Sequence, residues 1–213
     1  MESNIQKIFI TGVAGFLGSH IAECFLNEGY NVVGCDNLIG GDLKNVPSGV
    51  EFFEIDCNDL EQIKLISKNC SIFYHCAATA YEGLSSFSPY LITNNVFQNS
   101  IAVFSAAISN NARRIVYCSS MARYGNNQTP FDETQILNPV DPYGIAKVAA
   151  ENVLKCLCDT HNIEYVIAVP HNIIGPRQKY NDPYRNVASI MINMMLQGRQ
   201  PIIYGDGNQK RCF

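Results

Sequence analysis

Short apolar runs alternate with helical stretches along most of this chain. Runs of about five mostly apolar residues predict strands, and between them apolar residues recur at the spacing of one helix face. The predicted strands are 7–11, 31–35, 51–55, 71–75, 114–118 and 165–169. The predicted helices are 16–28, a segment that begins after Asp59, 89–110 and 141–161. Strands that alternate with helices predict an α/β fold with a Rossmann-type, doubly wound parallel sheet.

Polar residues and glycines mark the ends of several predicted helices. Asp59 with Gln62 three residues later fits a capping box. Asp141 with Pro142 fits an N-cap followed by the first helical position. Gly29 fits the residue that ends the first helix. We expect one side of that helix to be formed by Phe16, Leu17, His20, Ile21, Phe25 and Leu26.

The regular alternation stops after Pro170. Beyond it, the pattern predicts a Met-rich helix at 184–197 and a short strand at 201–204. The chain is therefore predicted to hold one large domain at 1–170 and the beginning of a smaller lobe at 171–213.

The composition fits one globular unit with a substantial core. Of 213 residues, 47% are hydrophobic, and the formal net charge of −4 gives no electrostatic reason to expect nucleic acid as a partner. No run of about 18 apolar residues is present that would predict a transmembrane helix. The N-terminus, Met1 to Asn4, is polar and leads into a strand, not into a secretory apolar region. We therefore expect a cytoplasmic protein.

Nine cysteines are scattered along the chain. Cys35, Cys76 and Cys118 lie inside apolar runs, which indicates buried reduced thiols and not a disulfide framework. Cys156 and Cys158 lie two positions apart in a predicted helix, and therefore on different faces. His75 has no second ligand pair at metal-binding spacing, so we expect ordinary packing for it and predict no metal site.

A glycine-rich turn joins the first predicted strand to the first predicted helix. Gly12 permits a tight turn, Gly15 lets the backbone approach a pyrophosphate, and Gly18 lets the helix pack close to the strand. The helix N-terminus adds unpaired N–H groups and the positive end of the helix dipole. Asp36 stands at the end of the second strand, where a carboxylate accepts hydrogen bonds from ribose hydroxyls and repels a 2′-phosphate. Together these residues predict a dinucleotide site that prefers NAD to NADP.

Tyr143 and Lys147 lie four residues apart, on one face of the predicted helix 141–161. A nearby ammonium, an oxidised nicotinamide and the helix N-terminus would each favour the phenolate of a tyrosine, whose ordinary pKa is about 10. Ser119 and Ser120 follow the fifth strand, at the sheet edge where the ligand crevice is expected. A serine there can relay a proton between a substrate hydroxyl and the tyrosine. The alternative is a surface Tyr–Lys pair, since this spacing is frequent by chance.

The spacing of the three glycines is one residue longer than the common dinucleotide pattern and resembles the extended short-chain dehydrogenase/reductase superfamily. In their order along the chain, the motifs resemble the nucleotide-sugar epimerase/dehydratase family, especially its UDP-glucose 4-epimerase type. The resemblance covers essentially the whole chain. It rests on the glycine turn, Asp36, 55–57, 75–78, 94–96, 119–120, 124–125, Tyr143 with Lys147, 170–172, 175–177 and 204–211.

The resemblance implies an isomerase of carbohydrate metabolism that inverts C4 of a UDP-glucose/UDP-galactose-type hexose through a 4-keto intermediate, with NAD regenerated in each cycle. It implies that Ser120, Tyr143 and Lys147 are catalytic and that Ser120, Asn172 and Arg211 contact the substrate. The cofactor residues that it implies are Gly12, Gly15, Phe16, Leu17, Gly18, Asp36, Asn37, Asp56, Cys57, Ala77, Ala78, Thr79, Asn95, Tyr143, Lys147, Pro170 and His171.

The resemblance also implies a homodimer, because family members often pair through the helices equivalent to 89–110 and 142–161. The apolar residues that could serve there could equally face only the sheet; they are Val96, Ile101, Val103 and Phe104. The 1–170 domain would then bind NAD, and 171–213 would be part of a substrate lobe. Family members run to roughly 300 residues, so we expect this chain to be a truncated form.

Two departures from the family pattern bear on activity. Gln98 and Asn99 stand where a Gly-Thr pair is common, and we expect them to alter helix packing more than chemistry. Met121 and Ala122 stand where dehydratases carry an Asp-Glu pair, which disfavours a dehydratase. Another NAD-dependent nucleotide-sugar oxidoreductase or dehydratase, and a non-catalytic NAD-binding protein, remain the alternatives.

Overall fold

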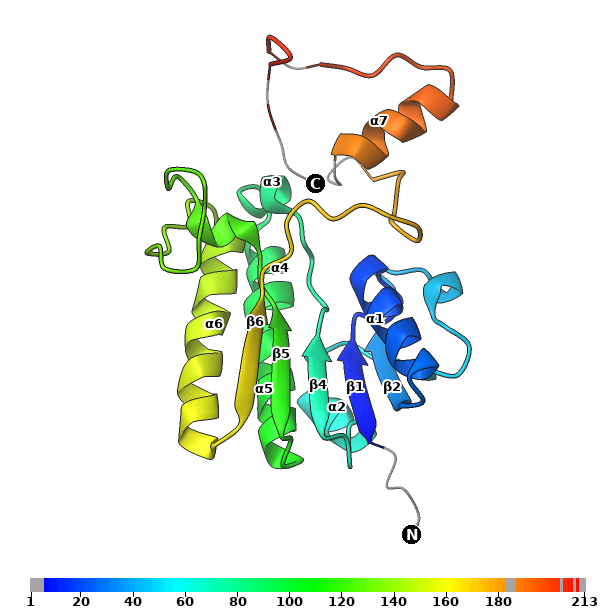
Figure 1. Cartoon of the computed structure of the whole chain (residues 1–213), viewed down its shortest axis with the longest axis vertical. Coiled ribbons are helices and arrows are strands. Elements are labelled where there is room, and N and C mark those ends of the chain that lie inside the picture. The colour runs from blue at the N-terminus through cyan, green and yellow to red at the C-terminus, as the bar shows by residue number, and fades with distance from the viewer. Residues whose placement is uncertain (1–5, 183–186, 204, 209, 211–213) are drawn as a thin grey trace.

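The structure, a computed structural model, describes residues 6–182, 187–203, 205–208 and 210. Its centre is a six-stranded parallel sheet in the order β3-β2-β1-β4-β5-β6 (Figure 1). Each strand ends within one residue of its predicted bounds, and the predicted doubly wound parallel sheet is confirmed. The strands are β1 (Lys7–Thr11), β2 (Asn31–Asp36), β3 (Glu51–Glu54), β4 (Ile72–His75), β5 (Arg114–Cys118) and β6 (Glu164–Ala168).

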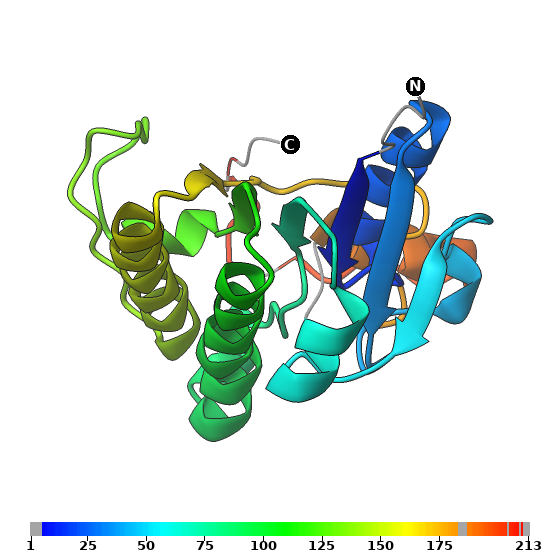
Figure 2. The ribbon, with the colours of Figure 1, turned by 90° about the horizontal axis from the view of Figure 1, so that it is seen from below.

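Helices cover both faces of the sheet. On one face lies α1 (Phe16–Asn27), and on the other lie α2 (Leu60–Ile66), α5 (Asn99–Ser109) and α6 (Pro142–His161) (Figure 2). In the described part of the chain, no helix is both long and apolar enough to cross a membrane. The other helical segments there are η1 (Leu43–Asn45), α3 (Glu82–Ser85), α4 (Pro89–Thr93), η2 (Asn94–Gln98), η3 (Met121–Tyr124) and α7 (Val187–Leu196).

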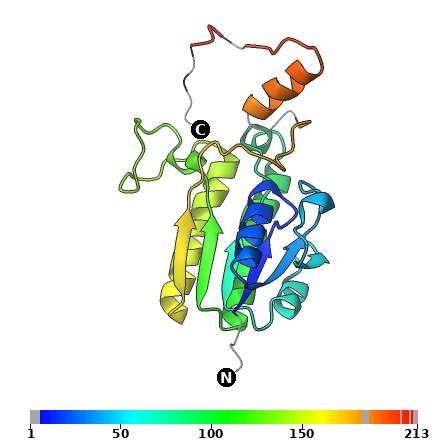
Figure 3. The ribbon, with the colours of Figure 1, turned by 45° about the vertical axis from the view of Figure 1, so that its right-hand side comes forward.

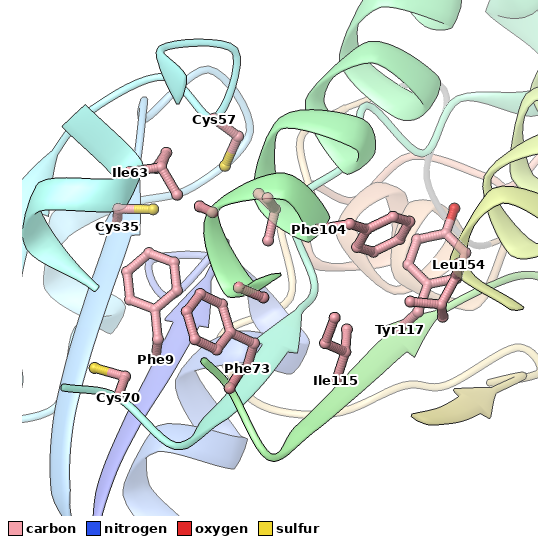
Figure 4. Packing of buried hydrophobic residues seen from close by; sticks show 14 of the residues in the cluster. Phe9, Cys35, Cys57, Ile63, Cys70, Phe73, Phe104, Ile115, Tyr117 and Leu154 are labelled. Atoms are coloured by element: carbon pink, nitrogen blue, oxygen red, sulfur yellow. The ribbon is translucent and has the colours of Figure 1, made fainter. Parts of the chain in front are cut away.

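The largest core lies between the sheet and helices α2, α5 and α6. Phe9, Phe73 and Ile115 occupy one row across β1, β4 and β5, and all are fully buried (Figure 4). Phe104 of α5 meets Tyr117 edge to face, with ring centres 5.5 Å apart. Burial of each such side chain stabilises the fold by about 1.5–3 kcal/mol. This layer therefore fixes the helices against the strands whose ends carry the candidate site.

The buried stripe of α1 differs from the predicted one. Its buried residues are small: Gly18, Ser19 and Ala22. A Cβ atom at position 18 would lie 2.2 Å from the carbonyl oxygen of Gly12, so the helix is too close to the turn for a larger side chain. The side chains of the predicted face are only partly buried and flank this stripe: Phe16, Leu17, His20, Ile21, Phe25 and Leu26.

The predicted helix 89–110 contains a π-helical turn. Helix α4, the π-helical η2 and α5 follow one another without a break. The Asn99 side chain donates to the carbonyl oxygen of Asn95 at 2.6 Å, and Ser100 Oγ donates to that of Val96 at 2.5 Å. Side chains therefore bond carbonyl groups in the widened turn, and such turns are frequent at functional sites.

The region after residue 182 follows the prediction only in part. Helix α7 begins at Val187 in the described chain, and residues 183–186 of the predicted helix lie outside it. The predicted strand at 201–204 is wrong for residues 201–203, and Tyr204 lies outside the described residues. A strand needs a neighbouring strand to bond its N–H and C=O groups, whereas Ile202 and Ile203 are exposed.

Candidate active site

One pocket lies at the carboxyl ends of the central strands. It is lined by the glycine turn after β1, by the loops after β2, β3 and β4, and by η2. Ligands of doubly wound sheets bind where the strand order reverses, which here is between β1 and β4. The predicted cofactor residues that line this pocket are Gly12, Gly15, Asp36, Asn37, Asp56, Cys57, Ala77, Ala78, Thr79 and Asn95.

The glycine turn forms a backbone cradle that side chains would fill. Gly12 has φ +70°, and a Cβ atom there would lie 2.8 Å from the backbone nitrogen of Ala77. The Gly15 N–H donates to the Gly12 carbonyl at 3.0 Å, which closes the turn. Phe16 and Leu17 then begin α1, and no side chain caps their helix end. The first-turn N–H groups therefore face the cradle without a protein acceptor from the cap, as a pyrophosphate site requires.

Asp36 and Asp56 are the acidic residues that line the pocket. The Asp36 carboxylate accepts hydrogen bonds from the N–H groups of Ala14 (3.1 Å) and Leu38 (2.8 Å), one on each oxygen. Burial raises the pKa of Asp36, and these hydrogen bonds oppose that shift. Asp56 accepts from the Asn37 side chain at 2.8 Å. Each Asp36 oxygen keeps lone-pair capacity for a further donor such as a ribose hydroxyl.

Tyr143 and Lys147 lie in the first two turns of α6 and are both buried. Lys147 Nζ donates to the Cys118 carbonyl at 2.7 Å and lies 5.9 Å from the centre of the Tyr143 ring. Burial raises the pKa of Tyr143 to about 12, and the neighbouring Ser120 hydroxyl acts in the opposite direction. Burial also lowers the pKa of Lys147 to about 8. The pair is therefore internal, which excludes the alternative of a surface Tyr–Lys pair.

The two serines after β5 face different partners. Ser120 caps η3, where its Oγ accepts from the Ala122 N–H at 3.2 Å, and it is the serine whose side chain acts to lower the pKa of Tyr143. Ser119 is buried, and its Oγ donates to the Glu151 carboxylate. Of the two, Ser120 is therefore placed for proton exchange with the tyrosine.

Glu151 and Arg123 belong to this site and were not predicted. Glu151 is fully buried on α6, and its carboxylate pairs with the Arg123 guanidinium at 3.1 Å. One signal was present in the sequence, because Glu151 follows Lys147 by four residues and so extends the face that begins at Tyr143. A buried charge on that face requires a partner, but the sequence does not show which cation supplies it.

His75 ties the strands together behind the pocket. Its Nδ1 lies 2.7 Å from Thr11 Oγ1, and its Nε2 lies 2.9 Å from Ser100 Oγ. The Ala77 N–H donates to the same Thr11 oxygen at 3.2 Å. Burial lowers the pKa of His75 to about 3, so the ring is neutral at physiological pH. The residue serves packing, as the sequence predicted, and it supports the pocket wall at Ala77.

The segment after β6 crosses the carboxyl edge of the sheet toward α1 (Figure 3). Arg177 forms a 2.7 Å ion pair with Glu23 of α1. Pro170, His171 and Asn172 begin this segment, and they do not line the pocket described above. The side chains of His171 and Asn172 lie 3.1 Å apart. Arg211, the predicted diphosphate contact, lies outside the described residues.

The fold and this site define a class: dinucleotide-binding, doubly wound α/β proteins with a Ser–Tyr–Lys group beside the cofactor pocket. Residues 8–213 match the model of the NAD dependent epimerase/dehydratase family, and the chain belongs to that family.

Several similar individual proteins and solved structures are named UDP-glucose 4-epimerases. The chain is 35% identical to the putative UDP-glucose 4-epimerase of Methanocaldococcus jannaschii, over 97% of this chain and 68% of that protein. It is similar to the crystal structure of the Thermotoga maritima UDP-glucose 4-epimerase with UDP-glucose (TM-score 0.90, 30% identity), covering 95% of this chain and 67% of that one. It is also similar to the Thermus thermophilus UDP-glucose 4-epimerase complex with NAD (TM-score 0.85, 29% identity, 91% and 64% covered).

Proposed function

We propose that this protein inverts C4 of a nucleotide-diphosphate hexose of the UDP-glucose/UDP-galactose type, with NAD as cofactor. The observation that carries the proposal is the position of Ser120, Tyr143 and Lys147 beside the glycine-cradle pocket. Tyr143 packs in one cluster with Ala78, a lining residue of that pocket. The UDP-sugar 4-epimerases among its relatives support the same reaction.

The pocket residues fit NAD. The cradle of Gly12, Gly15 and Gly18 would hold the pyrophosphate, and Asp36 would bond the adenosine ribose. Asp56 and Cys57 would face the adenine. Phe16, Leu17, Asn37, Ala77, Ala78, Thr79, Asn95, Pro170 and His171 complete the proposed contacts. When bound, NAD would supply the reversible hydride acceptor that oxidation and re-reduction of C4 require.

The chain's own residues supply proton transfer and position. Tyr143 takes the proton of the C4 hydroxyl, and Ser120 relays it, because its Oγ both donates and accepts. In the protein alone the pKa of Tyr143 is about 12, so its proton leaves only when positive charge favours the phenolate. Lys147, 5.9 Å from the centre of the Tyr143 ring, is already part of these surroundings, so the further positive charge would come from the oxidised nicotinamide of bound NAD. Asn172 and Arg211 are the proposed sugar-nucleotide contacts.

Replacement of Tyr143 by Phe tests this function directly. We expect conversion of UDP-galactose to UDP-glucose to fall about 10²–10⁴-fold, because a general acid–base group is lost, while NAD binding persists. Tyr165→Phe is the matched control, since Tyr165 is a partly exposed residue of β6 and lies outside the site. Unchanged turnover in Tyr143→Phe would refute the assignment.

Product analysis separates epimerisation from the other reactions of the family. A dehydratase needs an acid next to the catalytic hydroxyl, and the two positions that directly follow Ser120 are Met121 and Ala122. We therefore expect a C4 epimer as product, with no net formation of NADH. A stoichiometric rise in NADH absorbance would instead indicate an oxidoreductase, and NAD binding without any turnover would indicate a non-catalytic protein.

We also propose that the protein forms a homodimer in the cytoplasm. Val103 and Phe104 are fully buried in the core that packs on the sheet, and Val96 is fully buried in a cluster with Tyr143 and Ala146 of α6. The exposed apolar residues Tyr90 of α4 and Ile145 of α6 are the candidates for a contact with a second copy. Tyr90→Asp should then shift the mass measured by light scattering from dimer to monomer. The cysteines of the described residues are free thiols, which supports a reducing compartment.

A further inference from the structure

Two cysteines lie side by side at the carboxyl ends of β4 and β5. His75 and Tyr117 are paired across these parallel strands, so the next residues, Cys76 and Cys118, are neighbours. Their sulfur atoms are 3.5 Å apart, close enough for one thiol to donate to the other. Neighbouring strands lie about 4.8 Å apart, which is within the Cα–Cα range of disulfides, about 4.4–6.8 Å.

One of the two thiols is accessible from the cofactor pocket. Cys76 lines that pocket and is partly exposed, whereas Cys118 is buried behind it. Both belong to segments that hold the site. Ala77, which follows Cys76, bonds Thr11, and the Cys118 carbonyl accepts the hydrogen bond of Lys147. A change at either sulfur therefore acts on the pocket wall or on the position of Lys147.

The surroundings of Cys118 favour its reaction as a nucleophile. The hydrogen bond from Cys76 and the positive charge of Lys147 lower the pKa of Cys118, against the effect of burial. A lower pKa increases the thiolate fraction, which is the form that attacks another sulfur. The same hydrogen bond and burial raise the pKa of Cys76, but Cys76 is the partly exposed thiol that a small oxidant can reach from the pocket, and Cys118 lies next to it to react with the product.

We propose that Cys76 and Cys118 form an oxidisable dithiol, which hydrogen peroxide converts into a disulfide that weakens cofactor binding. The effect on the cofactor rests on the proposed NAD-binding function. In the first step, the Cys76 sulfur attacks a peroxide oxygen and the O–O bond breaks. The thiol proton joins the departing hydroxide to form water, which leaves a sulfenic acid on Cys76.

In the second step, the Cys118 sulfur attacks the sulfur of this sulfenic acid. The S–S bond forms as the S–O bond breaks, and the Cys118 proton leaves with the hydroxide as a second water. Two thiols are oxidised and one peroxide is reduced to two waters. The sulfurs must approach from 3.5 Å to a bond length of about 2.05 Å. That movement draws together the two backbone segments that carry Ala77 and Lys147.

The test treats the reduced full chain with hydrogen peroxide and maps its cysteines by mass spectrometry. We expect a cross-linked peptide pair joining Cys76 to Cys118, lighter by two hydrogens. NAD titration of the same samples should show about tenfold weaker binding after oxidation, restored by dithiothreitol. Cys118→Ser should form no such cross-link under the same peroxide treatment.

Two further variants separate this pair from other thiols. Cys24→Ser removes an exposed cysteine on α1 and should behave as the unmodified protein. Cys35→Ser tests a second pair of neighbouring thiols, because Cys57 acts together with burial to raise the pKa of Cys35. It should still form the Cys76–Cys118 cross-link and lose NAD affinity on oxidation. A response that disappears in Cys35→Ser would overturn the proposal.

Mass-spectrometric mapping of cysteine cross-links in the unmodified chain tests disulfide formation without any variant. Absence of a Cys76–Cys118 cross-link in oxidised protein overturns the proposal, as does a cross-link that leaves NAD affinity unchanged in a protein that binds NAD when reduced. If the proposed NAD-binding function is wrong, the same experiment gives a different result. In that case the reduced protein binds no NAD, while the mass of the peptide pair still reports on the dithiol.

Discussion

At the scale of single residues, the partners of two buried carboxylates determine whether each can bind a ligand. Asp36 and Glu151 are both buried carboxylates, yet their partners differ in kind. Asp36 is held by two backbone N–H groups and keeps lone pairs for a ligand. Glu151 is held by the Ser119 hydroxyl and the Arg123 guanidinium, both from this chain. The Asp36 carboxylate can therefore still accept hydrogen bonds from a ligand. The Glu151 carboxylate instead bonds groups of this chain and stabilises the site from within.

The replacement Asp36→Asn tests the cofactor preference. The neutral amide no longer repels a 2′-phosphate, and one of its two polar atoms cannot accept from the backbone. We expect NAD binding to weaken about tenfold and NADP binding to weaken less, so the ratio of the two dissociation constants falls. Titration with each cofactor measures this ratio. Asp42→Asn is the control, since Asp42 caps the exposed segment η1; an unchanged ratio in Asp36→Asn would contradict the role of Asp36.

The replacement Glu151→Gln tests the buried ion pair. It leaves the Arg123 charge without its carboxylate partner, which typically costs about 3–5 kcal/mol of unfolding free energy for a buried pair. Urea unfolding measures the loss. Glu61→Gln removes one partner of the exposed Lys64–Glu61 pair and should change stability by less than about 1 kcal/mol. Equal effects of the two variants would show that the Glu151 pair contributes no more than a surface pair.

At the scale of elements, α6 carries most of the proposed chemistry. Tyr143, Lys147 and Glu151 recur at four-residue spacing along its buried face, so one helix orients all three. The Asp141 side chain caps this helix by accepting from the Gly144 N–H at 2.9 Å. The direction of α6 at its first turn therefore depends on this cap, and Tyr143 lies in that turn.

The replacement Asp141→Ala should reduce both stability and activity. Loss of an N-cap costs about 1 kcal/mol of unfolding free energy. Asp59→Ala is the matched control, because Asp59 caps α2 through the Gln62 N–H and lies away from Tyr143. Both variants should lose similar stability in urea unfolding, while only Asp141→Ala should lower the rate of C4 epimerisation. Equal rates would mean that the cap does not position Tyr143.

At the scale of the whole molecule, a buried histidine of the sheet makes the free energy of unfolding depend on pH. His75 lies at the centre of the sheet, and its pKa falls from an ordinary value near 6.5 to about 3 on folding. The unfolded chain therefore binds more protons than the folded chain between these two values. The contribution of His75 is complete above pH 6.5 and is lost progressively as the pH falls toward 3.

We therefore expect the free energy of unfolding to decrease between pH 7 and pH 5, a window above the titration of ordinary carboxyl groups. Urea unfolding at both pH values measures the change. His75→Asn should be less stable at pH 7, because it loses packing against Tyr117, but should show a smaller difference between the two pH values. If His75→Asn shows the same difference in unfolding free energy between pH 7 and pH 5 as the unmodified chain, groups other than His75 cause the pH dependence.

Local sequence patterns predicted most of the fold. The bounds of the strands and the caps at Asp59 and Asp141 depend on neighbouring residues only, and the structure confirms them. The buried face of α1 was missed because it depends on how closely the helix approaches Gly12. The π-helical turn was missed for a related reason, since side chains of Asn99 and Ser100 stabilise it within a packed helix.

The sequence by itself determined the alternation of strands and helices, the glycine turn, and the residue types that proton transfer and NAD binding require. The tertiary structure alone decided which distant residues meet: Ser119 with Glu151, Thr11 with His75, and Cys76 with Cys118. These contacts depend on the order and register of parallel strands, which are set by packing across the whole sheet. A local pattern of polar and apolar positions carries no information about that order.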